Sequence, residues 1–183
     1  TGVQTCALPI YLSVASLLPA GRAAIERARE AGEAGFRTFK WKVGIGDPKD
    51  ELAMLEDLCA ELPSGSKLRL DPNRGWDRKT AERWLGRCAD RPVEFVEEPI
   101  GNDDVLAGLA EDYPTLIALD ESIAADEDLV HWTNREWPGL YVVKPALHAT
   151  EVIRAALGSS ERAARVVFSS ALETGVDRKS TRL

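Results

Sequence analysis

The chain has 183 residues, of which 44% are hydrophobic and 29% are charged. This composition is ordinary for a folded globular protein, so it excludes a wholly disordered chain. The formal net charge is −7. It argues against nucleic acid or an anionic membrane as a partner, because phosphate groups are bound by clustered Lys and Arg.

The three cysteines, Cys6, Cys59 and Cys88, lack the spacing of a metal site, and the last two fall within helical apolar patterns. We therefore expect reduced, buried thiols. No stretch reaches the roughly 18 apolar residues of a membrane-spanning helix. Residues 1–18 also lack the basic start of a signal peptide. These features together predict a cytoplasmic location.

Strand-like and helix-like patterns alternate along most of the chain, which predicts parallel strands joined by helical crossovers. The expected strands cover residues 12–18, 38–43, 67–70, 93–96, 115–119, 140–143 and 165–169. Helices are expected between them, over about residues 23–35, 50–62, 77–88 with Asp77 as N-cap, 103–111, 126–134 and 150–157. The pattern predicts an α/β fold of the (β/α)8 TIM-barrel type, incomplete here because there are about seven strands and no eighth.

Both ends of the chain differ from this pattern. Residues 1–10 show no clear period, and residues 177–183 are abruptly basic and polar. We interpret residues 1–10 as a non-native leader and residues 177–183 as a non-native tail, and exclude both from the fold. Residues 11–176 are then one partial barrel domain.

Charged residues lie at the ends of five successive predicted strands, at intervals close to one strand-plus-helix unit: Lys42, Asp71, Glu97, Asp120 and Lys144. Because all strands of such a barrel end at the same face, these side chains should converge. Carboxylate oxygens suit Mg²⁺, which keeps several water or substrate oxygens in its octahedron. Zn²⁺ is disfavoured, since the two histidines, His131 and His148, fit surface or helix-packing positions better.

Alternation along the strands decides which side chains face the interior. Lys40 and Lys42 share one side of their strand, and Trp41 faces the helices. If Phe95 fills the interior, Glu97 joins it there and Glu98 points away. Two bland alternatives stay open: the lysines could line a solvated edge, and Asp71-Pro72-Asn73 could be a simple turn.

Lys144 ends an apolar strand, where a buried ammonium needs carboxylate partners. A lysine beside a divalent cation and a second lysine is easier to deprotonate and suits general-base work. Ser169, Ser170 and Glu173 follow the seventh strand and could hold a substrate carboxylate. A helix cap with Glu173 near the capping-box position is an equal alternative.

Five motifs occur in register: Lys-x-Lys at 40–42, Asp-x-Asn at 71–73, Glu-Glu-Pro at 97–99, Asp-Glu-Ser at 120–122 and Lys-Pro at 144–145. In this order they resemble the muconate-lactonizing subgroup of the enolase superfamily. Within it, the stretches FKWKVG, VEFVEEPI, IALDESIA, YVVKPAL and VFSSALETG are most similar to the o-succinylbenzoate synthase family. The resemblance covers about residues 12–175, which would make residues 11–176 a partial enolase-type C-terminal barrel domain.

The resemblance implies a role for each charged strand end. Asp71, Glu97 and Asp120 would bind Mg²⁺, with Mn²⁺ as a substitute. Lys42 would remove the proton α to the substrate carboxylate and, as an ammonium, help the hydroxyl leave. Lys144 would be a cation facing the ene-diolate, with Lys40 in support. The expected substrate-binding residues are Asn73, Ser169, Ser170 and Glu173.

The implied reaction is the dehydration of 2-succinyl-6-hydroxy-2,4-cyclohexadiene-1-carboxylate to o-succinylbenzoate, a step of menaquinone or phylloquinone biosynthesis. The partner is thus a small-molecule carboxylate; the oligomeric state is left open. Two alternatives remain: an N-acylamino acid racemase or dipeptide epimerase with the same site, and a non-catalytic barrel fragment. The family also has an N-terminal capping domain and an eighth strand. We find neither, so we expect these 183 residues alone to have little or no activity.

Overall fold

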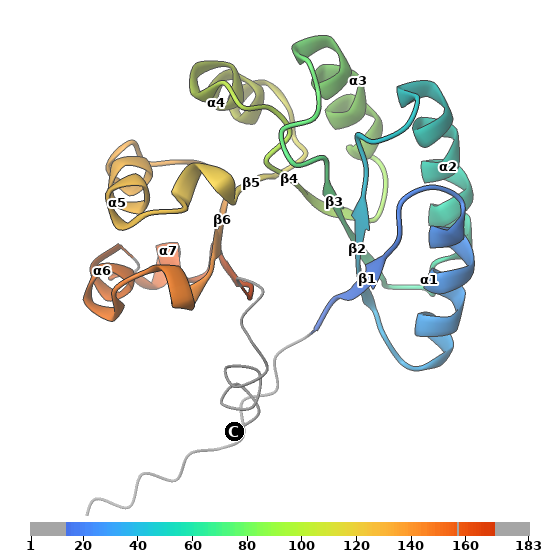
Figure 1. Cartoon of the computed structure of the whole chain (residues 1–183), viewed down its shortest axis with the longest axis horizontal. Coiled ribbons are helices and arrows are strands. Elements are labelled where there is room, and N and C mark those ends of the chain that lie inside the picture. Colours follow the sequence, from blue (N-terminus) through green and yellow to red (C-terminus); the bar gives the residue numbers. More distant parts are fainter. Residues whose placement is uncertain (1–13, 157, 171–183) are drawn as a thin grey trace, which may run out of the picture.

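The computed structural model of the chain describes residues 14–156 and 158–170. Seven parallel strands form one curled sheet in the order β1 to β7, so each strand lies beside its neighbour in the sequence (Figure 1). Within the described residues no pairing joins β7 to β1. The sheet is therefore an open arc of a barrel, and the predicted α/β barrel type with seven strands is confirmed.

The elements alternate as the sequence predicts. The strands are β1 (Ser16–Leu18), β2 (Thr38–Lys42), β3 (Lys67–Asp71), β4 (Val93–Glu97), β5 (Ile117–Leu119), β6 (Leu140–Val143) and β7 (Val166–Phe168). The helices are α1 (Ala23–Glu33), α2 (Pro48–Glu61), α3 (Arg78–Cys88), α4 (Asp103–Asp112), α5 (Asp126–Asn134), α6 (Thr150–Ala156) and α7 (Ser160–Ala163). Two 3₁₀ turns, η1 (Glu121–Ile123) and η2 (Pro145–Leu147), follow β5 and β6.

Side-chain caps fix where several helices begin. The predicted cap Asp77 accepts a hydrogen bond from the backbone N–H of Thr80 at 2.7 Å. Asp47 and Asn102 cap α2 and α4 in the same way. Helix α7 and both 3₁₀ turns were not predicted, because they are too short to show an apolar period.

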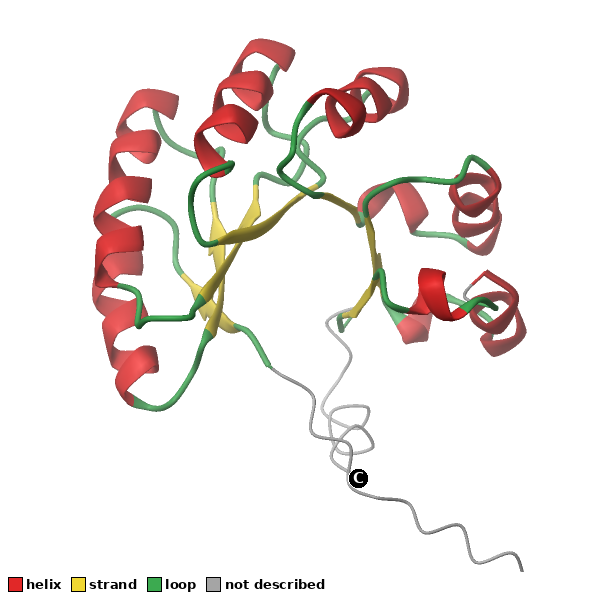
Figure 2. Cartoon of the chain, turned by 180° about the vertical axis from the view of Figure 1, so that it is seen from behind, coloured by secondary structure: helices red, strands yellow, loops and turns green. Residues whose placement is uncertain are grey.

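The helices cover the outer face of the curled sheet, and the main core lies between the two layers (Figure 2). Trp41 of β2 faces this layer, as predicted, and lies 6.3 Å from Trp84 of α3 between ring centroids. Trp84 in turn stacks on Trp76 at 4.8 Å. These indoles fill the space between β2, β3 and α3, which holds the strands that carry the predicted lysines in place.

The inner face of the arc has a different character. A small apolar cluster of Phe95, Ala118 and Val142 lines it. The register of β3 against β4 shifts by one residue, so that Leu68 pairs with Val93 and Arg69 with Phe95. The extra residue is Glu94, whose carboxylate lies 2.7 Å from both Lys67 Nζ and Arg69 Nε.

Cys59 is half-buried and Cys88 is buried, and both are free thiols. Burial raises the pKa of Cys59 to about 11 and that of Cys88 to about 12. These two cysteines are thus the inert thiols expected from the sequence, whereas Cys6 lies outside the described residues.

The predicted leader (residues 1–10), the predicted tail (residues 177–183) and Glu173 also lie outside the described residues. Across the described ranges, no helix combines the length and apolarity needed to cross a membrane.

The tryptophan layer yields a stability prediction. Trp84→Ala should lower the free energy of unfolding by about 3–5 kcal/mol, because it leaves a large cavity between α3 and the sheet. Val130→Ala, a control on the exposed side of α5, should change it by less than about 0.5 kcal/mol. Urea denaturation followed by circular dichroism measures both. Equal losses in the two variants would show that the indole layer does not carry the core.

Candidate active site

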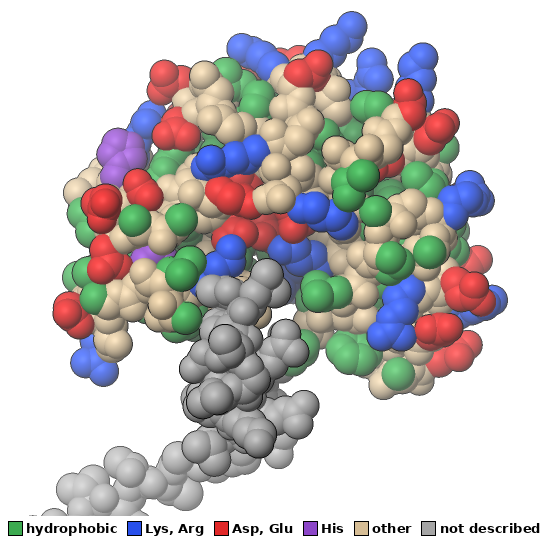
Figure 3. Space-filling view, viewed as in Figure 1, with side chains coloured by type: hydrophobic (Ala, Val, Ile, Leu, Met, Phe, Trp, Pro, Cys, Tyr) green, Lys and Arg blue, Asp and Glu red, His purple; other side chains and the backbone are tan. Residues whose placement is uncertain are grey.

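The charged residues singled out from the sequence converge at the carboxyl ends of the strands. Lys40 and Lys42 lie on β2, and Asp71 and Glu97 are the last residues of β3 and β4. Asp120 follows β5 directly, and Lys144 follows β6. Figure 3 shows acidic and basic side chains side by side near the centre of the molecule. We call these six residues the strand-end cluster: Lys40, Lys42, Asp71, Glu97, Asp120 and Lys144.

Lys40 joins two of the carboxylates. Its Nζ lies 3.1 Å from Asp71 Oδ2 and 2.8 Å from Glu97 Oε1. Lys42 Nζ lies 3.4 Å from the other oxygen, Asp71 Oδ1. Asp71 is therefore held between both lysines of β2, as the register that places Lys42 opposite Asp71 requires.

A second ion pair completes the cluster on the other side of the arc. Lys144 Nζ lies 2.5 Å from Asp120 Oδ1, and the Asp120 residue is only 9% exposed. The negative charges of Asp71 and Asp120 both act on Glu97, so the two groups of ion pairs share one electrostatic environment. The solvated-edge and simple-turn alternatives are thereby disfavoured, since Lys40 and Lys42 are both paired with Asp71 and all three side chains are partly buried.

Alternation along β4 explains the position of Glu97. Phe95 packs inside the arc with Ala118 and Val142, and Glu97, two residues later, lies on the same side. Glu98 points out of the interior, as predicted, toward the loop after β5.

The pKa of Glu97 is raised to about 7, mainly by burial and to a smaller extent by the charges of Asp71 and Asp120, while Lys40 opposes the shift. For Lys40, burial lowers the pKa, but the charges of Glu97 and Asp71 outweigh it, so the net shift is upward. The charged form of Glu97 is thus costly mainly because the side chain is buried, although three lysines accompany the three carboxylates of the cluster. A cation bound beside Glu97 would favour its charged form.

The carboxylates of the cluster supply the type of oxygen donor that a divalent cation prefers. Over residues 14–156 and 158–170, no group of three or more His, Cys, Asp or Glu is close enough to be a ready-made metal site. Each carboxylate of the cluster is instead paired with a lysine. Three hard oxygen donors on neighbouring strand ends still fit Mg²⁺ or Mn²⁺. Glu121 Oε2, buried with no hydrogen-bond partner in the described part of the chain, adds a fourth acidic donor nearby.

Glu121 is a site residue that sequence reasoning missed. Burial raises its pKa, and the charges of Asp120, Glu98 and Asp71 add to the shift. Its other oxygen contacts the side-chain amide of Asn73. The available signal was its place directly after Asp120 in a polar triplet that closes an apolar strand.

The structure describes the positions of three of the four predicted substrate-binding residues. Asn73 lies beside the cluster, and its backbone N–H donates to Asp71 Oδ1 at 3.1 Å. Ser169 follows β7, where its N–H donates to the carbonyl of Val143 at 3.0 Å, and Ser170 is next to it. Glu173 lies outside the described residues. Contact of these side chains with a substrate stays a prediction.

Of the two histidines, His131 is exposed on α5, whereas His148 is buried. His148 Nδ1 lies 3.1 Å from Asp126 Oδ1 at the start of α5. His148 also lines a cavity of about 100 Å³ together with Asp120 and Lys144. It is thus a packing residue, as expected, but it lies closer to the cluster than the sequence suggested.

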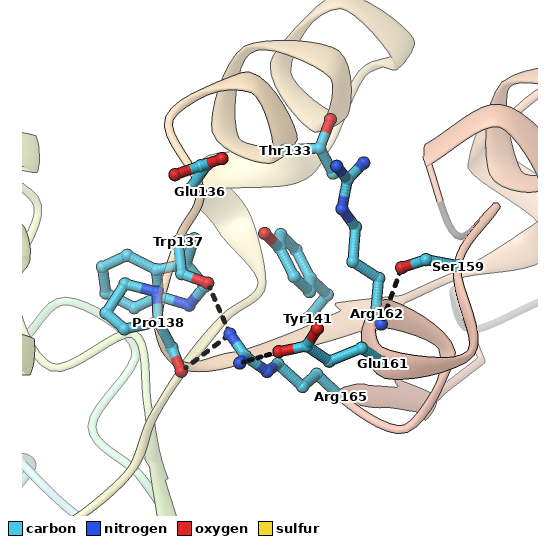
Figure 4. Close-up of a pocket in the computed structure, with 9 residues that line it drawn as sticks. All are labelled: Thr133, Glu136, Trp137, Pro138, Tyr141, Ser159, Glu161, Arg162 and Arg165. Atoms are coloured by element: carbon cyan, nitrogen blue, oxygen red, sulfur yellow. Dashed lines mark hydrogen bonds and ion pairs between the residues drawn. The ribbon is translucent and has the colours of Figure 1, made fainter.

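A roomier cavity of about 450 Å³ lies between α5, β6 and α7, remote from the strand-end cluster (Figure 4). Arg165 projects into it, but its guanidinium donates to the carbonyls of Trp137 and Pro138 and to Glu161. Its hydrogen-bonding capacity is therefore used within the fold. We place the candidate site at the strand-end cluster, where charged side chains from β2, β3 and β4 and from the ends of β5 and β6 converge.

The raised pKa of Glu97 predicts how stability depends on pH when metal is removed with EDTA. Between its ordinary value near 4.5 and about 7, the unfolded chain loses this proton while the folded chain keeps it. The Glu97 contribution should therefore lower the free energy of unfolding as the pH rises through this window. Urea denaturation at several pH values should show a flatter profile for Glu97→Gln. The exposed control Glu127→Gln should follow the wild type, and parallel profiles for all three would contradict the assignment.

Comparison with known proteins places this arrangement in a family. A model of the family described as enolase C-terminal domain-like matches residues 23–159. An o-succinylbenzoate synthase from Thermosynechococcus vestitus is 42% identical over 171 residues, which are 90% of this chain and 53% of that relative. An L-Ala-D/L-Glu epimerase from Bacillus subtilis is 38% identical over 97 residues, covering 52% of this chain and 25% of the epimerase.

A solved structure shows the same architecture. The crystal structure of o-succinylbenzoate synthase from Thermosynechococcus elongatus BP-1, complexed with Mg in its active site, has a TM-score of 0.85 and 40% identity. The match covers 92% of this chain and 54% of that one. The chain thus spans about half the length of these synthases. With the family match over residues 23–159 and the open barrel arc described above, the chain belongs to the enolase C-terminal domain-like family.

Proposed function

We propose that the protein containing this chain dehydrates 2-succinyl-6-hydroxy-2,4-cyclohexadiene-1-carboxylate to o-succinylbenzoate with the help of Mg²⁺ or Mn²⁺. One observation carries the proposal: three carboxylates lie between lysines that approach from β2 and from the end of β6, with β3, β4 and β5 between them. The likeness to the o-succinylbenzoate synthase from Thermosynechococcus vestitus and to the solved synthase structure supports the choice of substrate.

The lysines have separate tasks in this reaction. The neutral amine of Lys42 takes the proton α to the substrate carboxylate, and the electron pair of that C–H bond forms the ene-diolate. The resulting ammonium of Lys42 returns the proton to the departing hydroxyl, the C–O bond breaks, and water leaves as the ring becomes aromatic. The ammonium of Lys144 faces the ene-diolate from the other side of the arc.

The three carboxylates of the cluster help to stabilise the negative charge of the ene-diolate by binding a cation. Asp71, Glu97 and Asp120 would hold the divalent cation, which supplies positive charge beside the developing ene-diolate when bound. Lys40 is a positioning residue, since its ammonium bridges Asp71 and Glu97 and lies on the same strand as Lys42. The reduced thiols Cys59 and Cys88 fit a cytoplasmic reaction.

A second candidate function is proton transfer that inverts a stereocentre, as in racemisation of N-acylamino acids or epimerisation of dipeptides. The placement of Lys42 and Lys144 on opposite parts of the arc favours it, because one lysine could remove the proton and the other return it. The similarity to an L-Ala-D/L-Glu epimerase adds weight. Assays with the cyclohexadiene carboxylate and with N-succinylamino acids or dipeptides separate the two.

The proposed base gives a first test. Because the chain spans about half of its synthase relatives, the assay uses the longest native form of the protein, with the 183 residues alone expected to show little or no turnover. Lys42→Ala in that form should lower kcat by about 100-fold to 10,000-fold, as expected for loss of a general base. The exposed control Lys49→Ala should match the wild type. Persistent formation of o-succinylbenzoate by Lys42→Ala would remove Lys42 from its role.

The proposed ligands give a second test, independent of turnover. Mn²⁺ binding is followed by electron paramagnetic resonance. Asp71→Asn should raise the Kd by more than about 100-fold, since a direct ligand contributes more than the outer partners whose loss costs up to that amount. Asp57→Asn, an exposed carboxylate on α2, should leave the Kd unchanged. Equal binding by both variants would place the cation elsewhere.

A further inference from the structure

Glu98 is fully buried although it points away from the strand-end cluster. Its backbone has φ of +43°, in the left-handed region that a non-glycine residue enters only at some cost. Such strain persists where surrounding contacts fix the conformation. The buried carboxylate of Glu98 and its strained backbone must therefore be held by strong interactions with neighbouring residues.

The partners of Glu98 lie in the loop that begins with Asp120. Oε2 of Glu98 accepts hydrogen bonds from the backbone N–H of Asp120 at 2.8 Å and from that of Ser122 at 3.4 Å. The hydroxyl of Ser122 donates to Oε1. One carboxylate thus receives three donors from the start of the loop after β5, which fixes both ends of the Asp120–Ser122 segment.

Arg74 neutralises this carboxylate from the loop after β3. Its Nη2 lies 3.0 Å from Glu98 Oε1 and 2.8 Å from Ser122 Oγ, and its backbone N–H donates to the carbonyl of Glu98 at 2.7 Å. Arg74 also has a positive φ, of +61°. Glu98 thereby joins the loops that follow β3 and β5 to the end of β4.

Asp120 needs this support because the strand before it is short. Strand β5 has three residues, and it pairs with β4 only through Val96 with Ile117 and Glu97 with Ala118. The backbone of Asp120 has already left the strand conformation, with φ of −129° and ψ of −74°. An aspartate carboxylate is two bonds from its Cα, so its position follows that of the main chain.

We propose that Glu98 is a positioning residue that sets the affinity of the site for a divalent cation by fixing the main chain of Asp120. The inference rests on the proposed function, in which Asp120 is a ligand. A carboxylate that fixes a ligand without contacting the ion is an outer-shell partner, whose loss costs about tenfold to 100-fold in metal affinity.

The test measures the Kd for Mn²⁺ by electron paramagnetic resonance on this chain, at a temperature where thermal denaturation shows each variant to be fully folded. Glu98→Leu should raise the Kd by about tenfold to 100-fold. Glu98→Gln should raise it less, because its amide oxygen still accepts from the Asp120 N–H while Arg74 loses its carboxylate partner.

Glu51 provides a matched control. It is also a buried carboxylate, and it accepts backbone N–H groups of the loop after β2, from Gly44 at 2.8 Å, Gly46 at 3.0 Å and Ile45 at 3.2 Å. No proposed metal ligand lies in that loop. Glu51→Gln and Glu51→Leu should therefore lower thermal stability while leaving the Kd for Mn²⁺ as in the wild type.

The outcomes separate this inference from the proposed function. If the wild type binds no Mn²⁺, or Asp120→Asn binds it equally well, the metal site itself fails. If Asp120→Asn loses affinity but both Glu98 variants bind like the wild type, Glu98 has no positioning role. Equal increases in Kd for the Glu98 and Glu51 variants would also overturn it. If Glu98→Leu does not fold, Glu98→Gln decides, and an unchanged Kd for that variant refutes the inference.

Discussion

A buried charge must have a partner of opposite sign, and this constraint organises the whole carboxyl-terminal edge of the sheet. Lys40 satisfies it for Asp71 and Glu97 at once, and Lys144 satisfies it for Asp120. These pairings hold neighbouring strand ends together across the arc. Burial still disfavours the charged form of Glu97, and a cation bound beside this carboxylate would stabilise that form.

Outside the strand-end cluster, the buried charge of Glu98 also has a partner of opposite sign. The fully buried Glu98 pairs with the partly exposed Arg74, and the Glu98 carboxylate also accepts hydrogen bonds from the main chain of the Asp120 loop. Neither Glu98 nor Arg74 points to the inner side of the arc, but Glu98 fixes the main chain of Asp120, whose carboxylate does. Neighbouring glutamates of one motif thus have separate physical tasks, because alternation along β4 sends Glu97 inward and Glu98 outward.

The sequence allowed the prediction of much of this site. Lys42, Asp71, Glu97, Asp120 and Lys144 were recognisable because each ends an apolar run and because parallel strands end at one face. The family followed from the same motifs, and it is confirmed.

Other features depend on tertiary pairing that no sequence period reveals. Glu94 faces Lys67 and Arg69 only because β4 carries an extra residue against β3. Glu98 and Arg74 meet only because two loops adopt positive φ values. Helix α7 was missed since four residues, capped by Ser159, show no apolar period. The positions of charged residues in the sequence were enough to predict which of them end the strands. Their contacts depend on strand register and loop conformation, which the sequence pattern does not show.

The interior of the arc also has an apolar part. Near the start of β3, Lys67 and Arg69 are paired with Glu94 of β4, and Phe95, Ala118 and Val142 form an apolar cluster beyond them. Each of these three apolar residues precedes a charged residue of the strand-end cluster by two positions and so lies on the same side of its strand: Phe95 before Glu97, Ala118 before Asp120 and Val142 before Lys144. The apolar cluster therefore keeps water from one side of these charges, and their interactions with one another and with any ligand are stronger than they would be in water.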